Sequence, residues 1–293
     1  MQKIIIILEN DDSFIIEKPC IFLGAGVSKL SGYPNWQDLA YKLIDRFWKR
    51  RQEIKEKGKA YTNSDCEALR ESINKNNIVN VFTYLEDLNK GIYIEELKKI
   101  FNECEEKEDK KIFASIKMFS EFVDFFITTN IDRGLEKYLG LEEKYISIVS
   151  GSDTFRNLED INGKKIYYLH GRIDKPETWV FTREQYDSNH FKPGYCTSFL
   201  EYVFENFNVI FIGYGLKEIE VLKNLIGSNQ KHYRVEPTYD KRNDDLKIEA
   251  TIGKNTYNIE LIPYNVEEKG EEYLVEFLDK IYKDSKEEAR DAK

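Results

Sequence analysis

Pro19-Cys20-Ile21-Phe22-Leu23-Gly24-Ala25-Gly26-Val27-Ser28 is the segment around which the rest of the chain is arranged. Its first five residues form an apolar run of strand length, and a turn with two glycines follows. A helical pattern of hydrophobic residues begins at about Trp36. A strand, a glycine turn and a helix in this order form the phosphate-binding unit of nucleotide folds, because glycine lets backbone N–H groups approach a diphosphate. The segment therefore predicts a nucleotide site.

The composition limits the classes of protein that fit. A chain of 293 residues with 41% hydrophobic content is expected to form one α/β domain, here placed at residues 1–285, with a charged tail or linker at 286–293. The net charge of -9 argues against nucleic acid as a partner. The run Ile4–Leu8 is too short for a signal peptide or a membrane span, so we expect a cytosolic protein that is not bound to a membrane.

The four cysteines give no sign of a metal site. They are scattered, with no C-x-x-C pair and no cluster with histidine at the spacing of metal ligands. This pattern favours a reducing compartment and predicts that the chain has no zinc module. The cysteines are Cys20, Cys66, Cys104 and Cys196.

Residues 37–120 carry helical signals and little strand signal. A helix is expected over Trp36–Lys57, and a second one from Asn63, where Ser64 followed by Glu67 fits a capping box. Helical periodicity continues to about Phe119. One crossover needs far fewer residues, so the region is interpreted as a helical insertion, or alternatively as a plain helical cover on the sheet.

Strands alternate with helices in the second half of the chain. Expected strands cover residues 122–129, 165–169, 207–212 and 257–263, and expected helices end at Gly140, run from Glu218 to Ile226 and follow Tyr273. This alternation predicts a Rossmann-like parallel sheet with helices on both faces. Ligands bind such sheets at the carboxyl ends of the strands.

Glycine or polar residues stand at four of these strand ends, and we expect them to converge on one crevice. In particular, the side chains of Asn130 and His170 should face a common hollow above the first glycine turn. The four sets are Gly24-Ala25-Gly26, Thr129-Asn130 with Asp132, His170, and Gly213-Tyr214-Gly215.

Together these motifs resemble the sirtuin superfamily, and most of all the bacterial sirtuin-like domains of anti-phage systems such as Thoeris and the defence-associated sirtuins. The matching segments, which lie between about Pro19 and Ile226, are Gly24-Ala25-Gly26-Val27-Ser28, Gly32-Tyr33-Pro34-Asn35-Trp36, Thr128-Thr129-Asn130-Ile131-Asp132, Leu169-His170-Gly171 and Ile212-Gly213-Tyr214-Gly215.

The resemblance implies a set of residue roles. Asn130 would hold the nicotinamide ribose and the attacking water, Asp132 would contact the carboxamide or the ribose, and His170 would act as a general base. Metal would not be needed. The residues implied to bind the nucleotide are Gly24, Ala25, Gly26, Ser28, Pro34, Thr129, Gly213, Tyr214 and Gly215.

The resemblance also implies a function, namely hydrolysis of NAD to ADP-ribose and nicotinamide in abortive infection. It implies a homo-oligomer activated by a phage protein or by a second defence subunit or domain. The alternatives are an NAD-dependent protein deacylase and a non-catalytic sensor of NAD or ADP-ribose. Deacylating sirtuins usually carry four zinc-binding cysteines and a glutamine where Thr129 stands, so hydrolysis is favoured.

Other interpretations of single residues remain open. Asn130 could cap the following helix, and a histidine at a strand end, such as His170, is often structural. A dinucleotide reductase is less favoured because Lys29 replaces the third glycine of its fingerprint, and a P-loop is excluded because its Gly-Lys-Ser/Thr ending is absent. His190 and His232 are interpreted as structural residues.

Overall fold

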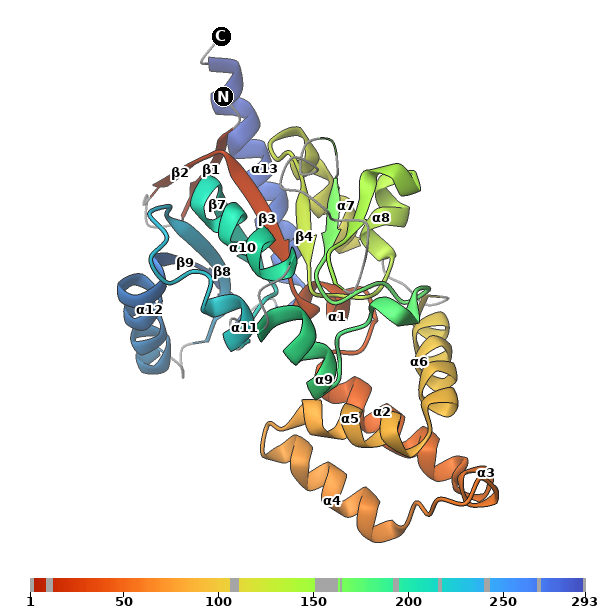
Figure 1. Cartoon of the computed structure of the whole chain (residues 1–293). Coiled ribbons are helices and arrows are strands. Elements are labelled where there is room, and N and C mark those ends of the chain that lie inside the picture. Colours follow the sequence, from red (N-terminus) through yellow and green to blue (C-terminus); the bar gives the residue numbers. More distant parts are fainter. Residues whose placement is uncertain are drawn as a thin grey trace.

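A parallel β-sheet of seven strands forms the centre of the molecule (Figure 1). The computed structural model describes residues 3–8, 13–105, 111–150, 163, 165–191, 195–215, 218–239, 243–267 and 270–291. Over these residues the strand order is β5-β6-β4-β3-β7-β8-β9, and a separate hairpin pairs β1 with β2. The strands are β1 Lys3–Ile7, β2 Ser13–Glu17, β3 Pro19–Leu23, β4 Phe126–Thr128, β5 Ile146–Ile148, β6 Ile166–Tyr168, β7 Asn208–Ile212, β8 His232–Thr238 and β9 Ile259–Asn265.

The central strand β3 is buried on both faces. Cys20 and Phe22 belong to one hydrophobic cluster, which includes Phe199 of helix α10 (Tyr195–Asn206). Ile21 and Leu23 belong to the other cluster, with the helices that precede β4. A strand whose side chains alternate between two cores has to be apolar throughout, which explains the unbroken run in the sequence. The predicted α/β class, with a parallel sheet covered on both faces, is confirmed.

The chain between β3 and β4 is helical. Figure 1 shows α2, α4 and α5 gathered beyond the end of the sheet at which β3 terminates. The helix expected over Trp36–Lys57 is divided at Arg50, which caps both halves. The helices of this region are α1 Ala25–Leu30, α2 Trp36–Lys49, α3 Arg51–Glu56, α4 Asn63–Asn74, α5 Ile78–Leu88, α6 Lys90–Glu105 and α7 Lys111–Met118.

The capping box of α4 differs from the predicted one. Thr62 and Asp65 form it, with Thr62 as the N-cap, whereas Ser64 lies inside the helix. Both pairs have the same spacing, but only Thr62 has the extended backbone that an N-cap needs. The prediction of a helix at Asn63 is confirmed, and the assignment of its cap to Ser64 and Glu67 is wrong.

Some predicted elements are shorter in the structure. The strand expected at 122–129 is reduced to β4, because a 3₁₀ turn, η1 (Phe119–Glu121), precedes it. The helix expected over Glu218–Ile226 is reduced to α11 (Ile219–Leu222). The other helices are α8 Gly134–Leu139, α9 Arg183–Tyr186, α12 Asn243–Tyr257 and α13 Tyr273–Asp291, and short helical turns cover Glu143–Tyr145, Pro176–Thr178 and Asp187–Phe191.

Helix α13 packs against the N-terminal hairpin. The Ser285 hydroxyl accepts a hydrogen bond from the Ile5 N–H at 2.9 Å, and this serine is buried. The charged segment from residue 286 continues as helix to Asp291, and residues 292–293 lie outside the described residues. Among the helices in the described part of the chain, none is long and apolar enough to cross a membrane.

Candidate functional site

The strand order places the four polar strand ends side by side. Strands β6, β4, β3 and β7 are consecutive neighbours and all run in the same direction. His170 therefore follows β6, Asn130 follows β4, Gly24 follows β3 and Gly213 follows β7 at one edge of the sheet. Because β3 is flanked by strands that come later in the chain on both sides, this edge is a switch point of the kind at which α/β proteins bind ligands.

Two glycine turns interlock at the centre of this edge. The Gly24 N–H donates to the Ile212 carbonyl at 3.0 Å, and the Gly26 N–H donates to the Gly213 carbonyl at 2.8 Å. A Cβ atom on Gly24 would lie 2.5 Å from the Gly213 oxygen. The glycines are therefore required by the contact between the turns, and these two N–H groups are engaged within the fold instead of being directed at a diphosphate.

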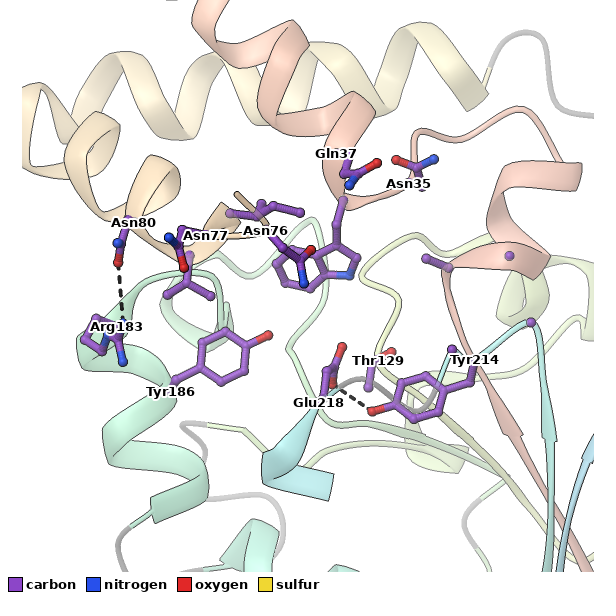
Figure 2. Close-up of a pocket in the computed structure, with 17 residues that line it drawn as sticks. Asn35, Gln37, Asn76, Asn77, Asn80, Thr129, Arg183, Tyr186, Tyr214 and Glu218 are labelled. Atoms are coloured by element: carbon purple, nitrogen blue, oxygen red, sulfur yellow. Dashed lines mark hydrogen bonds between the residues drawn. The ribbon is translucent and has the colours of Figure 1, made fainter. Parts of the chain in front are cut away.

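A cavity of about 580 Å³ opens above the interlocked turns (Figure 2). Gly26 and Gly213 form part of its floor, and Thr129 and Tyr214 line the same side. Its volume lies within the range of small-molecule sites in proteins. Of the residues predicted to bind a nucleotide, this cavity brings together Ala25, Gly26, Thr129, Gly213, Tyr214 and Gly215.

The opposite wall of the cavity comes from the helices between β3 and β4 and is rich in amides. Sequence reasoning did not identify these residues as part of the site. The one local signal is the run of asparagines between α4 and α5, where Asn76 has a φ of 62°. The amide residues that line this wall are Asn35, Gln37, Asn76, Asn77 and Asn80.

Two charged residues are found among the described residues that line the cavity, Arg183 and Glu218. Arg183 lies at the start of α9 and donates to the Asn80 amide oxygen at 3.5 Å. Glu218 accepts a hydrogen bond from the Tyr214 hydroxyl at 3.0 Å, and both contacts are drawn in Figure 2. The cavity therefore has hydrogen-bonding side chains on both of its walls and one charge of each sign.

A second and much smaller cavity, of about 30 Å³, adjoins the first. That is about the volume of one water molecule in the liquid. Ala25, Trp36 and Thr129 line both cavities. The other predicted site residues at the small cavity are Ser28, Pro34, Asn130 and Asp132.

Asn130 is held against the first glycine turn. Its Nδ2 donates to the Gly24 carbonyl at 2.9 Å, and its backbone N–H donates to the Thr128 hydroxyl at 2.9 Å. The interpretation of Asn130 as the cap of the next helix is wrong, because α8 has Arg133 as its N-cap. The amide side chain is instead fixed between the ends of two strands, at the smaller cavity.

Asp132 and Ser28 are bonded to each other. The Ser28 hydroxyl donates to Asp132 Oδ2 at 2.5 Å, and Asp132 Oδ1 accepts from the Gly134 N–H at 3.0 Å. Both side chains are buried, and burial raises the pKa of the Asp132 carboxyl above its usual value. Ser28, predicted to cradle a diphosphate, therefore has its hydroxyl hydrogen committed to the carboxylate.

His170 is fully buried. It is not one of the described residues that line the two cavities. The Trp36 and Tyr186 rings, which line the larger cavity, lie at centroid distances of 5.9 and 5.4 Å from its imidazole. Burial lowers the pKa of His170 well below its usual value, with a smaller contribution from His190. The imidazole is therefore neutral, and the expectation that His170 faces a hollow shared with Asn130 is not met.

The described residues contain no group of three or more His, Cys, Asp or Glu side chains that could hold a metal ion. All four cysteines are free and buried. Burial raises the pKa of Cys196 to about 12.

The fold and the site define an α/β protein with a small-molecule cavity at the switch point of its sheet. Residues 124–262 match the family model described as the SIR2-like domain. This match supports the sirtuin-like domain that the motifs predict.

Solved structures of sirtuins show a distant likeness. A Sir2 structure described under the mechanism and regulation of Sir2 enzymes is 14% identical, covers 94% of each chain and has a TM-score of 0.41. A Sir2 homologue in complex with NAD is 11% identical, covers 93% of this chain and 90% of its own, and has a TM-score of 0.37. The assignment rests on the family model, because both TM-scores are below 0.5. Among curated proteins, no match to the chain is found.

Proposed function

We propose that the protein binds NAD in the larger cavity and hydrolyses it to ADP-ribose and nicotinamide. The observation that carries this proposal is the position of the cavity, which lies over two interlocked glycine turns at the switch point of a sirtuin-like domain. The sirtuin structure solved with NAD is a precedent for this ligand in a related fold. The amide-rich wall supplies donors and acceptors for ribose hydroxyls and for a nucleobase.

The rate of this reaction depends more on the positioning of the ribose and the water than on a strong nucleophile. The bond between C1′ of the ribose and the pyridinium nitrogen breaks, its electron pair neutralises the nicotinamide, and an oxocarbenium-like carbon takes up water with release of a proton. A fixed amide such as that of Asn130 is suited to holding the ribose or the water. The reaction requires neither a metal ion nor a covalent nucleophile.

In the cell, this activity would serve anti-phage defence by depleting NAD. In this proposal the chain acts as a homo-oligomer with a basal activity, which a phage component or a second defence subunit or domain raises. The motif resemblance supports this context.

The test is nicotinamide release from NAD, measured by chromatography on each oligomeric fraction of the purified chain. Asn130→Ala is expected to lower the rate at least about 100-fold, since the positioning of reactants supplies several kcal/mol of barrier reduction. The matched control is Asn102→Ala, at an exposed position of α6, which should keep the wild-type rate. Full activity of Asn130→Ala in a fraction where the wild-type chain is active would reject the role of Asn130.

A second candidate function is a sensor that binds NAD or ADP-ribose without turnover. The burial of His170 away from both cavities favours it, because the sequence motifs nominate this residue as the base. Calorimetric binding of NAD without nicotinamide release in any oligomeric fraction would support the sensor over the hydrolase.

A further inference from the structure

Glu218 stands between the buried imidazole of His170 and the larger cavity. The carboxylate lines the cavity, and its Oε2 lies 3.7 Å from His170 Nε2. The same oxygen accepts the hydrogen bond from the Tyr214 hydroxyl. Two side chains at the ends of different strands thus approach one oxygen of a group that reaches the ligand space, as Figure 2 shows for Glu218 and Tyr214.

The imidazole of His170 has no hydrogen-bond partner. Neither ring nitrogen has one among the described residues, although the side chain is fully buried. A buried polar group without a partner is costly and therefore rare in folded proteins. Aromatic rings surround His170, and the carboxylate of Glu218 is the acceptor that a small side-chain rotation would bring into hydrogen-bonding distance.

We propose that Glu218 is the catalytic base of this site and that His170 is a positioning residue, which holds the carboxylate from behind. This inference rests on the proposed hydrolysis of NAD. As the water oxygen forms its bond to C1′ and the bond to the nicotinamide nitrogen breaks, the carboxylate takes one proton from that water. The proton then returns to solvent through the open cavity.

The geometry favours Glu218 over His170 for this task. A base must reach the proton that it removes, directly or through one water, and Glu218 lines the cavity whereas His170 does not. Burial also keeps the imidazole neutral, so it can donate one hydrogen bond to the carboxylate without forming an ion pair. In this arrangement Glu218 accepts the hydrogen bond and His170 donates it, which fixes the orientation of the carboxylate.

Several ionisable groups face this pair and contribute to its pH dependence. Tyr214 and Arg183 line the same cavity, and Tyr186 lies against His170. On the far side, His190 has its ring centroid 5.2 Å from that of His170, and its carbonyl accepts a hydrogen bond from Lys223. Cys196, whose thiol is 3.5 Å from His190 Nδ1, completes the cluster.

The experiment compares Glu218→Gln, which keeps the shape but cannot take a proton, with Glu201→Gln at an exposed position of α10 as control. Glu218→Gln should lower kcat at least about 100-fold with the NAD dissociation constant changed less than about threefold, and Glu201→Gln should change neither. His170→Phe should lower kcat about tenfold and move the acidic limb of the pH profile to higher pH, because the carboxylate loses a hydrogen-bond donor.

A second measurement separates this inference from the proposed function. The chain has three histidines, so the ¹⁵N signals of their rings can be assigned by NMR without any substrate. Glu218→Gln should shift the Nε2 signal of His170, and Glu201→Gln should leave it unchanged. Unchanged His170 signals in Glu218→Gln would overturn the positioning contact, whatever the activity.

The kinetic outcomes are equally decisive. If the wild-type chain releases nicotinamide and Glu218→Gln keeps more than half of that rate, the catalytic role of Glu218 is overturned while the proposed function stands. If the wild-type chain releases no nicotinamide in any oligomeric fraction, both the proposed hydrolysis of NAD and the role of Glu218 as its base are rejected. The NMR result then tests only the contact between Glu218 and His170.

Discussion

Gly213 is the residue on which the floor of the cavity depends. Its φ is +61°, and a Cβ atom on it would lie 2.6 Å from the Val27 nitrogen. Gly213→Ala is therefore expected to lower the free energy of unfolding by more than the roughly 1 to 2 kcal/mol of a left-handed backbone alone. Urea unfolding at pH 7.5 measures the loss.

Gly227 supplies the matched control for that substitution. It also has a positive φ, +86°, but no atom lies within 4 Å of the place that a Cβ atom on it would take. Gly227→Ala isolates the cost of the backbone conformation, so the difference between the two variants reports the clash between the turns. Equal losses in both variants would contradict the interlocked arrangement.

The strand-end residues could be found from sequence, but their contacts could not. Glycines after an apolar run and the polar residues after β4 are local signals, and the structure places them at one edge of the sheet. The pairing of Ser28 with Asp132 joins residues that are 104 positions apart, and no local pattern encodes it. The burial of His170 has the same origin, because the rings that cover it come from α2 and α9.

At the scale of elements, hydrogen bonds join α9 to α5, which forms part of the helical wall of the cavity. The Arg183 N–H donates to the Thr83 hydroxyl of α5 at 3.0 Å, and Gln185 donates to the Glu86 carboxylate at 3.3 Å. Thr83→Val removes the hydroxyl and keeps the shape. It should weaken NAD binding about three- to tenfold, since one hydrogen bond contributes about 0.5 to 1.5 kcal/mol. Calorimetric titration with NAD measures this change.

The control for this prediction is a helix cap away from the cavity. Thr62→Ala removes the capping box of α4 and should cost about 1 kcal/mol of stability while leaving NAD affinity unchanged. If Thr83→Val binds NAD as the wild-type chain does, the contact between α9 and α5 does not set the shape of the cavity.

Elements with strong local patterns were predictable, and those defined by packing were not. The sequence predicts β3 and the amphipathic α2, because burial on one or both faces imposes a pattern of apolar residues that can be read from the sequence. Strands β1, β2, β5 and β8 and helices α1, α9, α10 and α12 have no counterpart among the elements that the sequence predicts. Strand β5 is only three residues long, Ile146–Ile148, and its pairing with β6 defines it.

At the scale of the whole molecule, burial of all three histidines makes stability depend on pH. Burial lowers the pKa of His190 and of His232 to about 4, and that of His170 well below 6.5. Unfolding exposes them, so between pH 6.5 and about 4 the unfolded chain binds protons that the folded chain does not. Stability contributed by the neutral histidines is thus complete above pH 6.5 and is lost as the pH falls.

His232 gives the cleanest test of this dependence. Its Nδ1 accepts a hydrogen bond from the Val209 N–H at 3.2 Å, and the amide oxygen of an asparagine can take over that role. Each buried histidine contributes a slope of about 1.4 kcal/mol per pH unit in this window. His232→Asn should flatten the plot of unfolding free energy against pH by that amount between pH 6 and 4.5, measured by urea unfolding, with little change of slope above pH 7. Parallel plots for the variant and the wild-type chain would mean that His232 takes up its proton in the folded state as readily as in the unfolded one.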